Sequence, residues 1–363
     1  MNRLPIIDEK TPLRAILLIQ LADIGDVIIT YPCVRMLRDR FPRARILLAV
    51  REKTAALVDI CPWADETIAI PRATGNLADR LRQQVVFFRA LRRHRIDLAI
   101  DLLTGDRGAL LAYLSGARQR VGFYAADGTL WRNRLFTQLY RSPRIPGQHR
   151  IDYYRSLLEA CGLRTQHPMP KIPVRPTEKA KARELLRTEG VPADRPYMVL
   201  QPFSLWPHKE WKLPRFASLV SWMISSYRLS VLIIGSGNER AGAEEIVARC
   251  GNGVYNIAGK TTLDVLPAIF SGAVVFVGID SSGAHFAAAV GTPTVTLFGP
   301  TLSSAWGYTG KRHAIVTKGY TCIPCDRKGC DGSNVSRCLD YLSTEAVISA
   351  VRNHLQYFMA PHQ

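Results

Sequence analysis

The chain has 363 residues, which is enough for two domains with separate hydrophobic cores. Its hydrophobic share of 47% is typical of a globular protein, no apolar run reaches transmembrane length, and the first residues lack the hydrophobic region of a signal peptide, so we expect a cytoplasmic protein. The net charge is +18, of which residues 1–175 contribute +13, with 29 Lys and Arg against 16 Asp and Glu.

The positive charge of the first half consists mostly of arginine, whose planar guanidinium group suits phosphate and carboxylate. Three partners fit such a charge: nucleic acid, an anionic membrane surface or an anionic substrate. The sequence contains no recognised nucleic-acid motif and no basic stretch interleaved with aromatic residues, so we expect no nucleic acid. Solvated helix faces account for many of the individual arginines.

Short apolar segments alternate with longer amphipathic ones through the first half of the chain. The apolar segments predict strands at Ile16–Gln20, Ile46–Val50, Thr67–Ile70, Leu98–Asp101 and Gln119–Gly122. The amphipathic segments predict helices such as Pro32–Arg40 and Leu77–His94. Strands that alternate with helices form a parallel, doubly wound sheet, so this half is expected to be an α/β domain.

Asp26 follows the first predicted strand, next to Gly25. In a doubly wound sheet, an acid at the carboxyl end of a strand faces the ligand crevice. A carboxylate with a raised pKa can accept a proton from a hydroxyl group there, as a general base. The alternative that Asp26 only stabilises the dipole of the following helix stays open.

A second domain of the same kind is predicted after a linker. The proline-rich stretch His167–Pro176 marks the linker, and Thr177–Glu189 predicts the next helix. Further strands are predicted at Met198–Gln201, Val231–Ile234, Val254–Asn256, Val274–Gly278 and Thr294–Phe298. We therefore expect domains at residues 1–170 and 177–343, and a C-terminal segment, residues 344–363, with a helix at Thr344–Phe358.

Two loops of the second domain could contact a nucleotide. Lys209, which follows the strand Met198–Gln201, could hold the charge of a departing diphosphate, or be an ordinary solvated lysine. The loop Gly235–Glu239 contains Gly-x-Gly after a strand, which by itself is as typical of an ordinary turn as of a nucleotide site.

The segment Val274–Thr301 is the most informative part of the sequence. It predicts a strand, a turn at Ile279–Gly283 that carries Asp280, a helix at Ala284–Val290 and a second strand. Ser281, Ser282 and Gly283 would present backbone N–H groups at the helix N-terminus, which favours phosphate. An ordinary βαβ crossover would give the same pattern.

Four of the eight cysteines are clustered near the C-terminus, at Cys322, Cys325, Cys330 and Cys338. In a cytoplasmic protein, clustered thiols indicate a structural zinc or iron site more than disulfides. Their spacing is tighter than that of a zinc ribbon, so a metal-free cluster is the alternative.

The segment Val274–Thr301 resembles the signature of glycosyltransferase family 9, the lipopolysaccharide heptosyltransferases, which reads roughly D-S/T-G-x-x-H-x-A-A-A-x-G-T-P-x-x-x-L-F-G-P-T. The matching residues are Asp280, Ser281, Gly283, His285, Ala287, Ala288, Ala289, Gly291, Thr292, Pro293, Leu297, Phe298, Gly299, Pro300 and Thr301. With Gly283 as the family glycine, the turn would be one residue longer than in this pattern. Three more segments, Ile16–Ile46, Gly105–Phe123 and Gln201–Val220, are similar to other parts of the family in the same order.

The resemblance implies a GT-B fold, in which two Rossmann-like domains face each other across a cleft and the last helix packs back on the first domain. It also implies an inverting, metal-independent enzyme that transfers heptose from ADP-heptose to the inner core of lipopolysaccharide. Asp26 would be the base, Lys209 would meet the leaving diphosphate, and Glu239 would contact the ribose. Asp280, the Ser281–Gly283 turn and His285 would complete the donor site.

The acceptor implied by the resemblance is a phosphorylated lipid A–core glycolipid, for which Arg107 and Arg120 are candidate contacts. Peripheral contact with the anionic inner membrane would explain the charge of the first domain. The alternatives are another nucleotide sugar or surface-glycan acceptor within the family, a protein that binds an anionic glycan or nucleic acid without catalysis, and a nucleotide-dependent oxidoreductase. The absence of a G-x-G-x-x-G after the first strand counts against the oxidoreductase.

Overall fold

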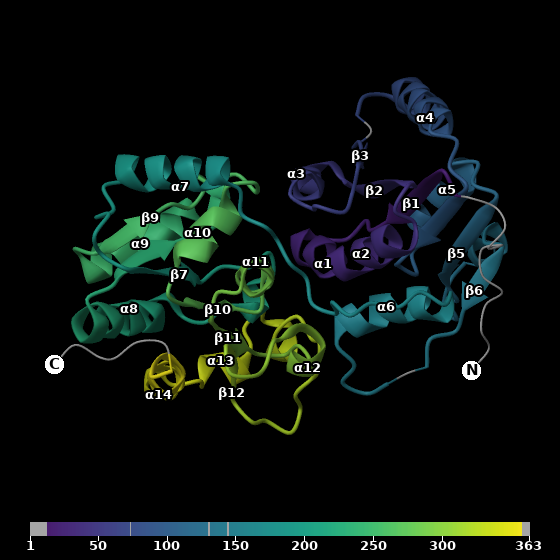
Figure 1. The fold of residues 1–363 in the computed structure, drawn as a ribbon. Helices are drawn as coiled ribbons and strands as arrows, with labels where there is room; N and C mark the ends of the chain where they lie inside the picture. Colours follow the sequence, from purple (N-terminus) through teal and green to yellow (C-terminus); the bar gives the residue numbers. More distant parts are fainter. Residues whose placement is uncertain (1–12, 73, 130, 144, 358–363) are drawn as a thin grey trace. The chain divides into compact units, whose positions relative to one another are not determined.

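The computed structural model describes residues 13–72, 74–129, 131–143 and 145–357. The chain is organised in two units, residues 1–170 and 171–363, and the division falls inside the predicted linker. Each unit is a parallel sheet flanked by helices (Figure 1).

The first unit is built on a six-stranded sheet in the order β3-β2-β1-β4-β5-β6, with every pairing parallel. Its strands are β1 (Ala15–Ile19), β2 (Arg45–Arg51), β3 (Glu66–Ile70), β4 (Leu98–Asp101), β5 (Gln119–Phe123) and β6 (Gln138–Tyr140). Its helices are α1 (Ile24–Ile29), α2 (Tyr31–Arg40), α3 (Ala56–Asp59), α4 (Leu77–Arg93), α5 (Asp106–Leu114) and α6 (Arg150–Ala160).

The second unit has a six-stranded sheet in the order β12-β11-β10-β7-β8-β9, again with parallel pairings. Its strands are β7 (Tyr197–Gln201), β8 (Ser230–Ile233), β9 (Val254–Asn256), β10 (Phe276–Ile279), β11 (Thr294–Phe298) and β12 (His313–Thr317). Its helices are α7 (Pro176–Thr188), α8 (Leu213–Tyr227), α9 (Arg240–Cys250), α10 (Leu266–Gly272), α11 (Ser282–Val290), α12 (Ser303–Trp306), α13 (Arg337–Asp340) and α14 (Thr344–Leu355).

The two sheets have the same strand order when each is numbered from its own first strand. In both, the first strand lies beside the fourth, so the order reverses between β1 and β4 and between β7 and β10. Such a reversal leaves a crevice at the carboxyl ends of the strands, where doubly wound folds bind ligands. The topology thus places one candidate site in each unit, and the predicted doubly wound α/β fold is confirmed.

The central strands are apolar because helices cover both faces of each sheet. All five residues of β1 and all five of β11 are buried. All the interior strands were predicted, as were the edge strands β3 and β9, whereas the edge strands β6 and β12 were not predicted. The residues of β6 are all half-buried, so they lack the continuous apolar run that marks a buried strand.

Helix α14 is the observed form of the helix predicted at Thr344–Phe358, and residue 358 lies outside the described residues. It packs against α8, β11 and β12, and its buried side chains Val347, Val351 and Leu355 belong to the core of the second unit. The apolar face of α14 is thus buried within the second unit, and the prediction that this helix also packs back on the first domain stays a prediction.

Candidate active site

A buried ion pair lies at the strand reversal of the second unit. Lys209 ends a short 3-10 helix, Pro207–Lys209, that follows β7, and Asp280 directly follows β10. The Nζ of Lys209 donates to the Oδ2 of Asp280 at 2.7 Å, and the side chains are 19% and 8% exposed. The hydroxyl of Thr301 donates to the same carboxylate oxygen at 2.6 Å. The structure therefore brings together two residues that the sequence suggested separately.

The N-terminus of α11 is held by a glutamine from the neighbouring strand. The amide oxygen of Gln201 accepts from the N–H of Gly283 at 2.8 Å, and its amide nitrogen donates to the hydroxyl of Ser281 at 3.3 Å. Because Gln201 takes the N–H of Gly283, this terminus offers an anion fewer donors than the sequence suggested. A β-carbon on Gly283 would lie 2.2 Å from the Gln201 oxygen, so only glycine leaves room for this contact.

The turn between β10 and α11 contains no additional residue. Strand β10 extends to Ile279 and α11 begins at Ser282, which leaves Asp280 and Ser281 between them. Asp280 and His285 are five positions apart, as are the Asp and His of the family pattern, so Ser282 takes the place of the pattern's glycine. The expectation of a longer turn, which took Gly283 as that glycine, is wrong.

Two other residues that were predicted to bind the sugar donor, His285 and Glu239, contact neighbouring residues of the second unit. His285 is buried inside α11, its Nδ1 lies 2.9 Å from the hydroxyl of Tyr308, and its ring meets that of Trp306 edge-on. The carboxylate of Glu239 accepts from the N–H of Ser236 at 2.5 Å, inside the turn that follows β8. A direct contact of either residue with a donor remains a prediction, and the buried position of His285 does not favour it.

In the first unit, Asp26 lies in the first turn of α1, the first helix after β1. The hydroxyl of Tyr154 on α6 donates to its Oδ1 at 2.7 Å. Burial raises the pKa of Asp26, the Tyr154 hydrogen bond opposes this shift, and the nearby Asp23 adds to it. Asp23 itself pairs with Arg51 and Lys53 at the surface, so Asp26 is the better candidate for a proton acceptor.

A second acid of the first unit, Asp101, was not singled out from the sequence. It ends β4 and is fully buried together with Arg132, whose Nη2 lies 3.5 Å from its Oδ2. Burial raises the pKa of Asp101 to about 7, a shift that its bond from the Leu103 N–H and the Arg132 cation only partly oppose. Arg132 also donates to the carbonyl oxygens of Leu103 and Phe123, so the pair connects the carboxyl ends of β4 and β5.

The two predicted acceptor arginines differ in their surroundings. The guanidinium of Arg120 donates to the carbonyl oxygens of Leu135 and Ala117 and lies over the ring of Tyr113. These contacts within the first unit leave it fewer N–H groups for an acceptor phosphate. Arg107 is exposed in the first turn of α5, and its side chain has no partner among the described residues. Arg107 is therefore the better placed of the two to meet an anionic acceptor.

The four clustered cysteines do not form a metal site in the described part of the chain. Cys322 is exposed, Cys325 and Cys330 are half-buried, and Cys338 is buried, with its pKa raised to about 11 chiefly by burial. Among the described residues, no three His, Cys, Asp or Glu side chains are arranged so that they could hold a metal ion. The zinc or iron site predicted at these cysteines therefore stays a prediction, which the arrangement of the described residues does not support.

Several partners of the site residues came to light only in the structure. Tyr154, Gln201 and Thr301 are each far in sequence from the residue that they contact. Lys328 lies 5.6 Å from the ring of Trp206, and together with burial and Lys209 it lowers the pKa of His208. A second lysine, which no sequence pattern indicated, thus lies beside Trp206 and close enough to His208 to affect its pKa.

Comparison with known proteins decides the family. The sequence model described as glycosyltransferase family 9 (heptosyltransferase) matches residues 85–335, more than half of the chain. The chain belongs to glycosyltransferase family 9. It is accordingly a glycosyltransferase, and its two sheets are those of the GT-B fold.

Relatives with curated names are similar over most of the chain. Lipopolysaccharide heptosyltransferase 3 of Escherichia coli K12 is 28% identical over 286 residues, which cover 78% of this chain and 81% of that protein. Lipopolysaccharide heptosyltransferase 1 of Pseudomonas aeruginosa PAO1 is 26% identical over 322 residues, 87% of each chain.

Solved structures of the family share the fold. The E. coli ADP-heptose lipopolysaccharide heptosyltransferase II has a TM-score of 0.77 at 21% identity, covering 94% of this chain and 99% of that one. The E. coli heptosyltransferase WaaC with ADP has a TM-score of 0.69 at 17% identity, covering 95% and 99%. None of the helices in the described residues is long and apolar enough to cross a membrane.

Proposed function

We propose that this family 9 enzyme transfers heptose from ADP-heptose to the inner core of lipopolysaccharide, with inversion and without a catalytic metal. The names of its relatives, all lipopolysaccharide heptosyltransferases in the cases above, support the sugar and the acceptor class. The observation that carries the proposal is the Lys209–Asp280–Thr301 cluster, which suits a site for a leaving diphosphate.

The burial of this cluster argues for a role beyond stability. A buried ion pair adds little net stability, because desolvation of both charges offsets most of their attraction. What Asp280 and Thr301 do provide is a fixed position for the ammonium group of Lys209. A preorganised cation stabilises the charge that develops on a leaving diphosphate, so no metal is required for that task. Asp280 would then be a positioning residue for Lys209.

Transfer with inversion requires a base and a leaving group on opposite faces of the sugar. Asp26 would accept the proton of the acceptor hydroxyl as its oxygen bonds to the anomeric carbon. The bond from that carbon to the β-phosphate oxygen breaks at the same time, and ADP leaves with the electron pair. The raised pKa of Asp26 supports this role, because a stronger base is a better proton acceptor.

We further propose that the acceptor is the phosphorylated lipid A–core glycolipid at the cytoplasmic face of the inner membrane, with Arg107 as a contact to a phosphate. The +13 charge of residues 1–175 supports an anionic acceptor at the first unit. The alternative within the family is an enzyme that uses another nucleotide sugar or adds a later residue of the surface glycan. Such an enzyme would use the same Lys209–Asp280–Thr301 cluster to bind the diphosphate of its own donor.

Calorimetry with a panel of nucleotides tests the donor. We expect ADP to bind with higher affinity than UDP or GDP, and ADP-heptose to support transfer to a heptose-free core acceptor, detected as a product mass increase. Lys209→Ala should weaken ADP binding by about 10- to 100-fold, because a hydrogen bond between charged groups is lost.

Lys212→Ala is the matched control, because Lys212 is three residues away and pairs with Asp340 at the surface. It should leave ADP affinity unchanged. Equal affinity of wild type and Lys209→Ala for ADP would refute the role of Lys209. Preference for another nucleotide, with Lys209→Ala still weakening its binding, would instead refute ADP-heptose as the donor.

A further inference from the structure

Helix α4 of the first unit exposes a stripe of apolar side chains. Leu77, Leu81 and Val85 are 73%, 59% and 49% exposed. Residues four apart share one face of an α-helix, so these three form a continuous stripe over two turns. Single exposed apolar residues need no explanation, but an aligned series on one helix face indicates a contact surface.

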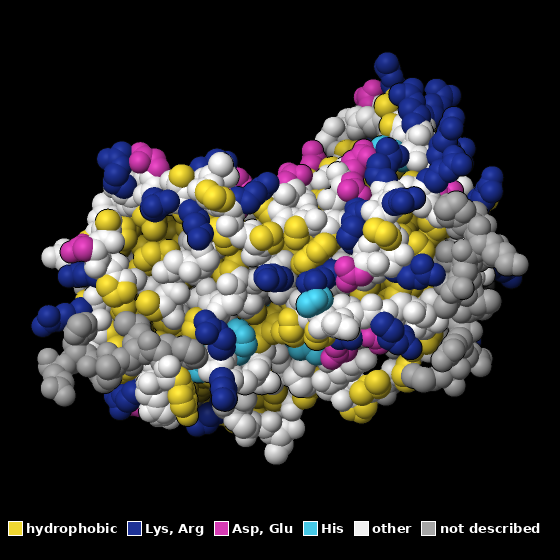
Figure 2. Space-filling view, viewed as in Figure 1, with side chains coloured by type: hydrophobic (Ala, Val, Ile, Leu, Met, Phe, Trp, Pro, Cys, Tyr) yellow, Lys and Arg dark blue, Asp and Glu magenta, His cyan; other side chains and the backbone are white. Residues whose placement is uncertain are grey.

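A stripe of arginines runs alongside the apolar one. Arg82, Arg89 and Arg93 follow seven and four residues apart, which places them on the adjoining face of α4. All three are exposed, and the structure gives their guanidinium groups no partner among the described residues. In all, α4 carries five arginines and one acid, Asp79, and Figure 2 shows the Lys and Arg side chains gathered over this part of the first unit.

Only the C-terminal half of α4 is anchored in the core of the first unit. Leu91 is buried there, and Phe87 and Phe88 pack against the same core. Figure 1 shows the rest of the helix projecting beyond β3. It is held to the preceding loop by the side-chain amide of Gln83, which donates to the Thr74 carbonyl at 3.1 Å and accepts from its N–H at 3.3 Å.

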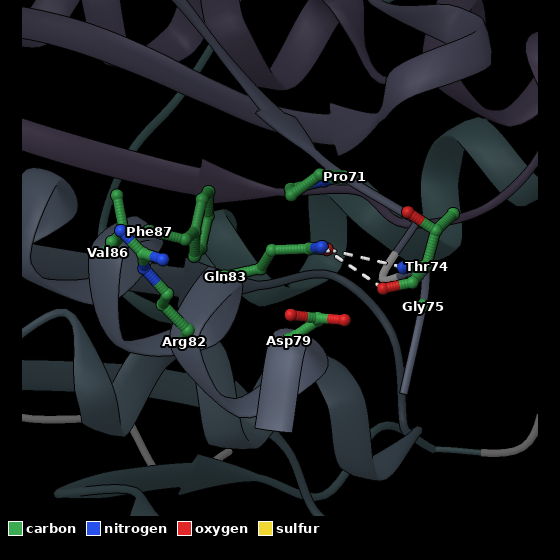
Figure 3. A pocket seen from close by; sticks show the side chains of 8 residues that line it. All are labelled: Pro71, Thr74, Gly75, Asp79, Arg82, Gln83, Val86 and Phe87. Atoms are coloured by element: carbon green, nitrogen blue, oxygen red, sulfur yellow. Dashed lines mark hydrogen bonds between the residues drawn. The ribbon is translucent and has the colours of Figure 1, made fainter. Parts of the chain in front are cut away.

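The inner side of this projecting half is also uncovered. An open hollow of about 740 Å³ lies between the helix and the loop before it, and Figure 3 shows Arg82 and Val86 lining it from the helix and Pro71 from the loop. The first turns of α4 are therefore exposed on two sides.

We propose that the exposed surface of α4 defined by Leu77, Leu81, Val85, Arg89 and Arg93, with Arg82 at its border with the hollow, docks on the surface of an anionic lipid bilayer. A helix with an apolar stripe and flanking arginines lies in a membrane interface, with its apolar side chains in the acyl boundary and its cations at the headgroups. Nucleic acid would use the arginines but not the leucines. The proposal names the surface by which the proposed enzyme reaches a membrane-bound acceptor, and its test does not depend on transfer.

Vesicle cosedimentation of the full chain tests the proposal. Wild type should bind vesicles of phosphatidylglycerol and phosphatidylethanolamine, and bind phosphatidylcholine vesicles much less. Leu77→Gln/Leu81→Gln/Val85→Gln should weaken binding tenfold or more, on the order of the loss of three partly inserted side chains. Arg82→Gln/Arg89→Gln/Arg93→Gln should weaken it on the order of a hundredfold, at about 1 kcal/mol per arginine.

The matched control removes three exposed cations from the second unit, with Lys179→Gln/Arg183→Gln/Arg187→Gln on α7, and should bind vesicles as wild type does. All variants should keep the circular dichroism spectrum and ADP affinity of wild type, since α4 lies in the other unit from the donor cluster. The proposal is overturned if wild type does not bind anionic vesicles. It is also overturned if Leu77→Gln/Leu81→Gln/Val85→Gln binds them as wild type does. Equal loss in the control would mean general charge attraction and overturns it too, as would self-association through α4 in place of vesicle binding.

Discussion

At the scale of single residues, the hydroxyl of Tyr154 tunes the proposed base. Burial raises the pKa of Asp26, and the hydrogen bond from Tyr154 stabilises the charged carboxylate and so limits that rise. The same contact raises the pKa of Tyr154 itself, which is already high because the phenol is buried, so Tyr154 stays protonated and keeps donating. The hydrogen bond from Tyr154 thus favours the charged form of Asp26, whereas burial disfavours it.

Tyr154→Phe should move the acidic limb of the pH profile of kcat/KM to higher pH. A general base must be deprotonated, and without the phenol hydroxyl the pKa of Asp26 rises further, so activity is lost at a higher pH as the solution is acidified. The measurement is a full pH profile for wild type and variant. Tyr153→Phe is the control, because that ring stacks on Phe123 and no hydrogen bond connects it to Asp26. An unmoved limb in Tyr154→Phe would mean that Asp26 is not the group that titrates.

The sequence indicated one member of each contact in the site, and the structure supplied the other. Asp26, Lys209 and Asp280 were noticed because each lies in a loop or turn that follows a predicted strand and because a family pattern contains them. Tyr154 is separated from Asp26 by 128 positions, and Lys209 from Asp280 by 71. No local periodicity encodes such pairs, which arise only when the sheet brings the ends of its strands together.

At the scale of elements, interior strands were predictable and segment ends were not. A central parallel strand is buried on both sides and shows a continuous apolar run, whereas β12 is mostly half-buried. The region after β1 was expected to hold a single helix, but it breaks into α1 and α2 at Thr30, whose hydroxyl donates to the carbonyl oxygen of Asp26 at 2.7 Å. Pro32, which has no backbone N–H, stands in the first turn of α2 and favours a helix start there, and the side chain of Gln20 donates to the Thr30 hydroxyl at the break.

Gly283→Ala should destabilise the second unit by about 1–3 kcal/mol, the usual effect of overpacking a filled site. The new methyl group would displace the Gln201 amide that caps α11 and would also press on the ring of Phe276. The unfolding midpoint of the second unit, identified by its shift on addition of ADP, is the quantity to measure. Ser282→Ala, one position earlier and half-buried, should cause no comparable loss. Equal stability of the two variants would show that the second unit can accommodate a β-carbon at position 283 beside the Gln201 amide oxygen.

At the scale of the whole molecule, charge is distributed unevenly along the chain. Residues 1–175 carry +13 of the total of +18, which leaves +5 for residues 176–363. Exposed charges act over about 8 Å at physiological ionic strength, so a surface rich in arginine attracts an anionic acceptor mainly at low salt. The donor cluster works differently, because Lys209 and Asp280 are largely shielded from solvent ions.

The KM of a soluble, deacylated but phosphorylated core acceptor should therefore rise severalfold between about 0.05 and 0.3 M salt, in keeping with charge screening. The affinity for ADP, measured in the same buffers, should change less. An acceptor without phosphates serves as the control and should show a weaker dependence on salt. The same salt dependence for both acceptors would show that the basic surface does not contact the acceptor phosphates.

Helix α4 lies in the connection from the edge strand β3 to the central strand β4, where changes in sequence disturb the sheet little. Strands β1 and β4 are neighbours, with Ile16 opposite Leu98, and the chain between them runs out to the edge strand β3 and returns through α4. Lengthening such an excursion has a small entropic penalty, about 0.6 kcal/mol for each doubling of its length. Insertions or substitutions in α4 can thus accumulate without shifting the register that positions Asp26 and Asp101. The docking surface that we propose on α4 can thus change under selection while the reaction that the enzyme catalyses stays the same.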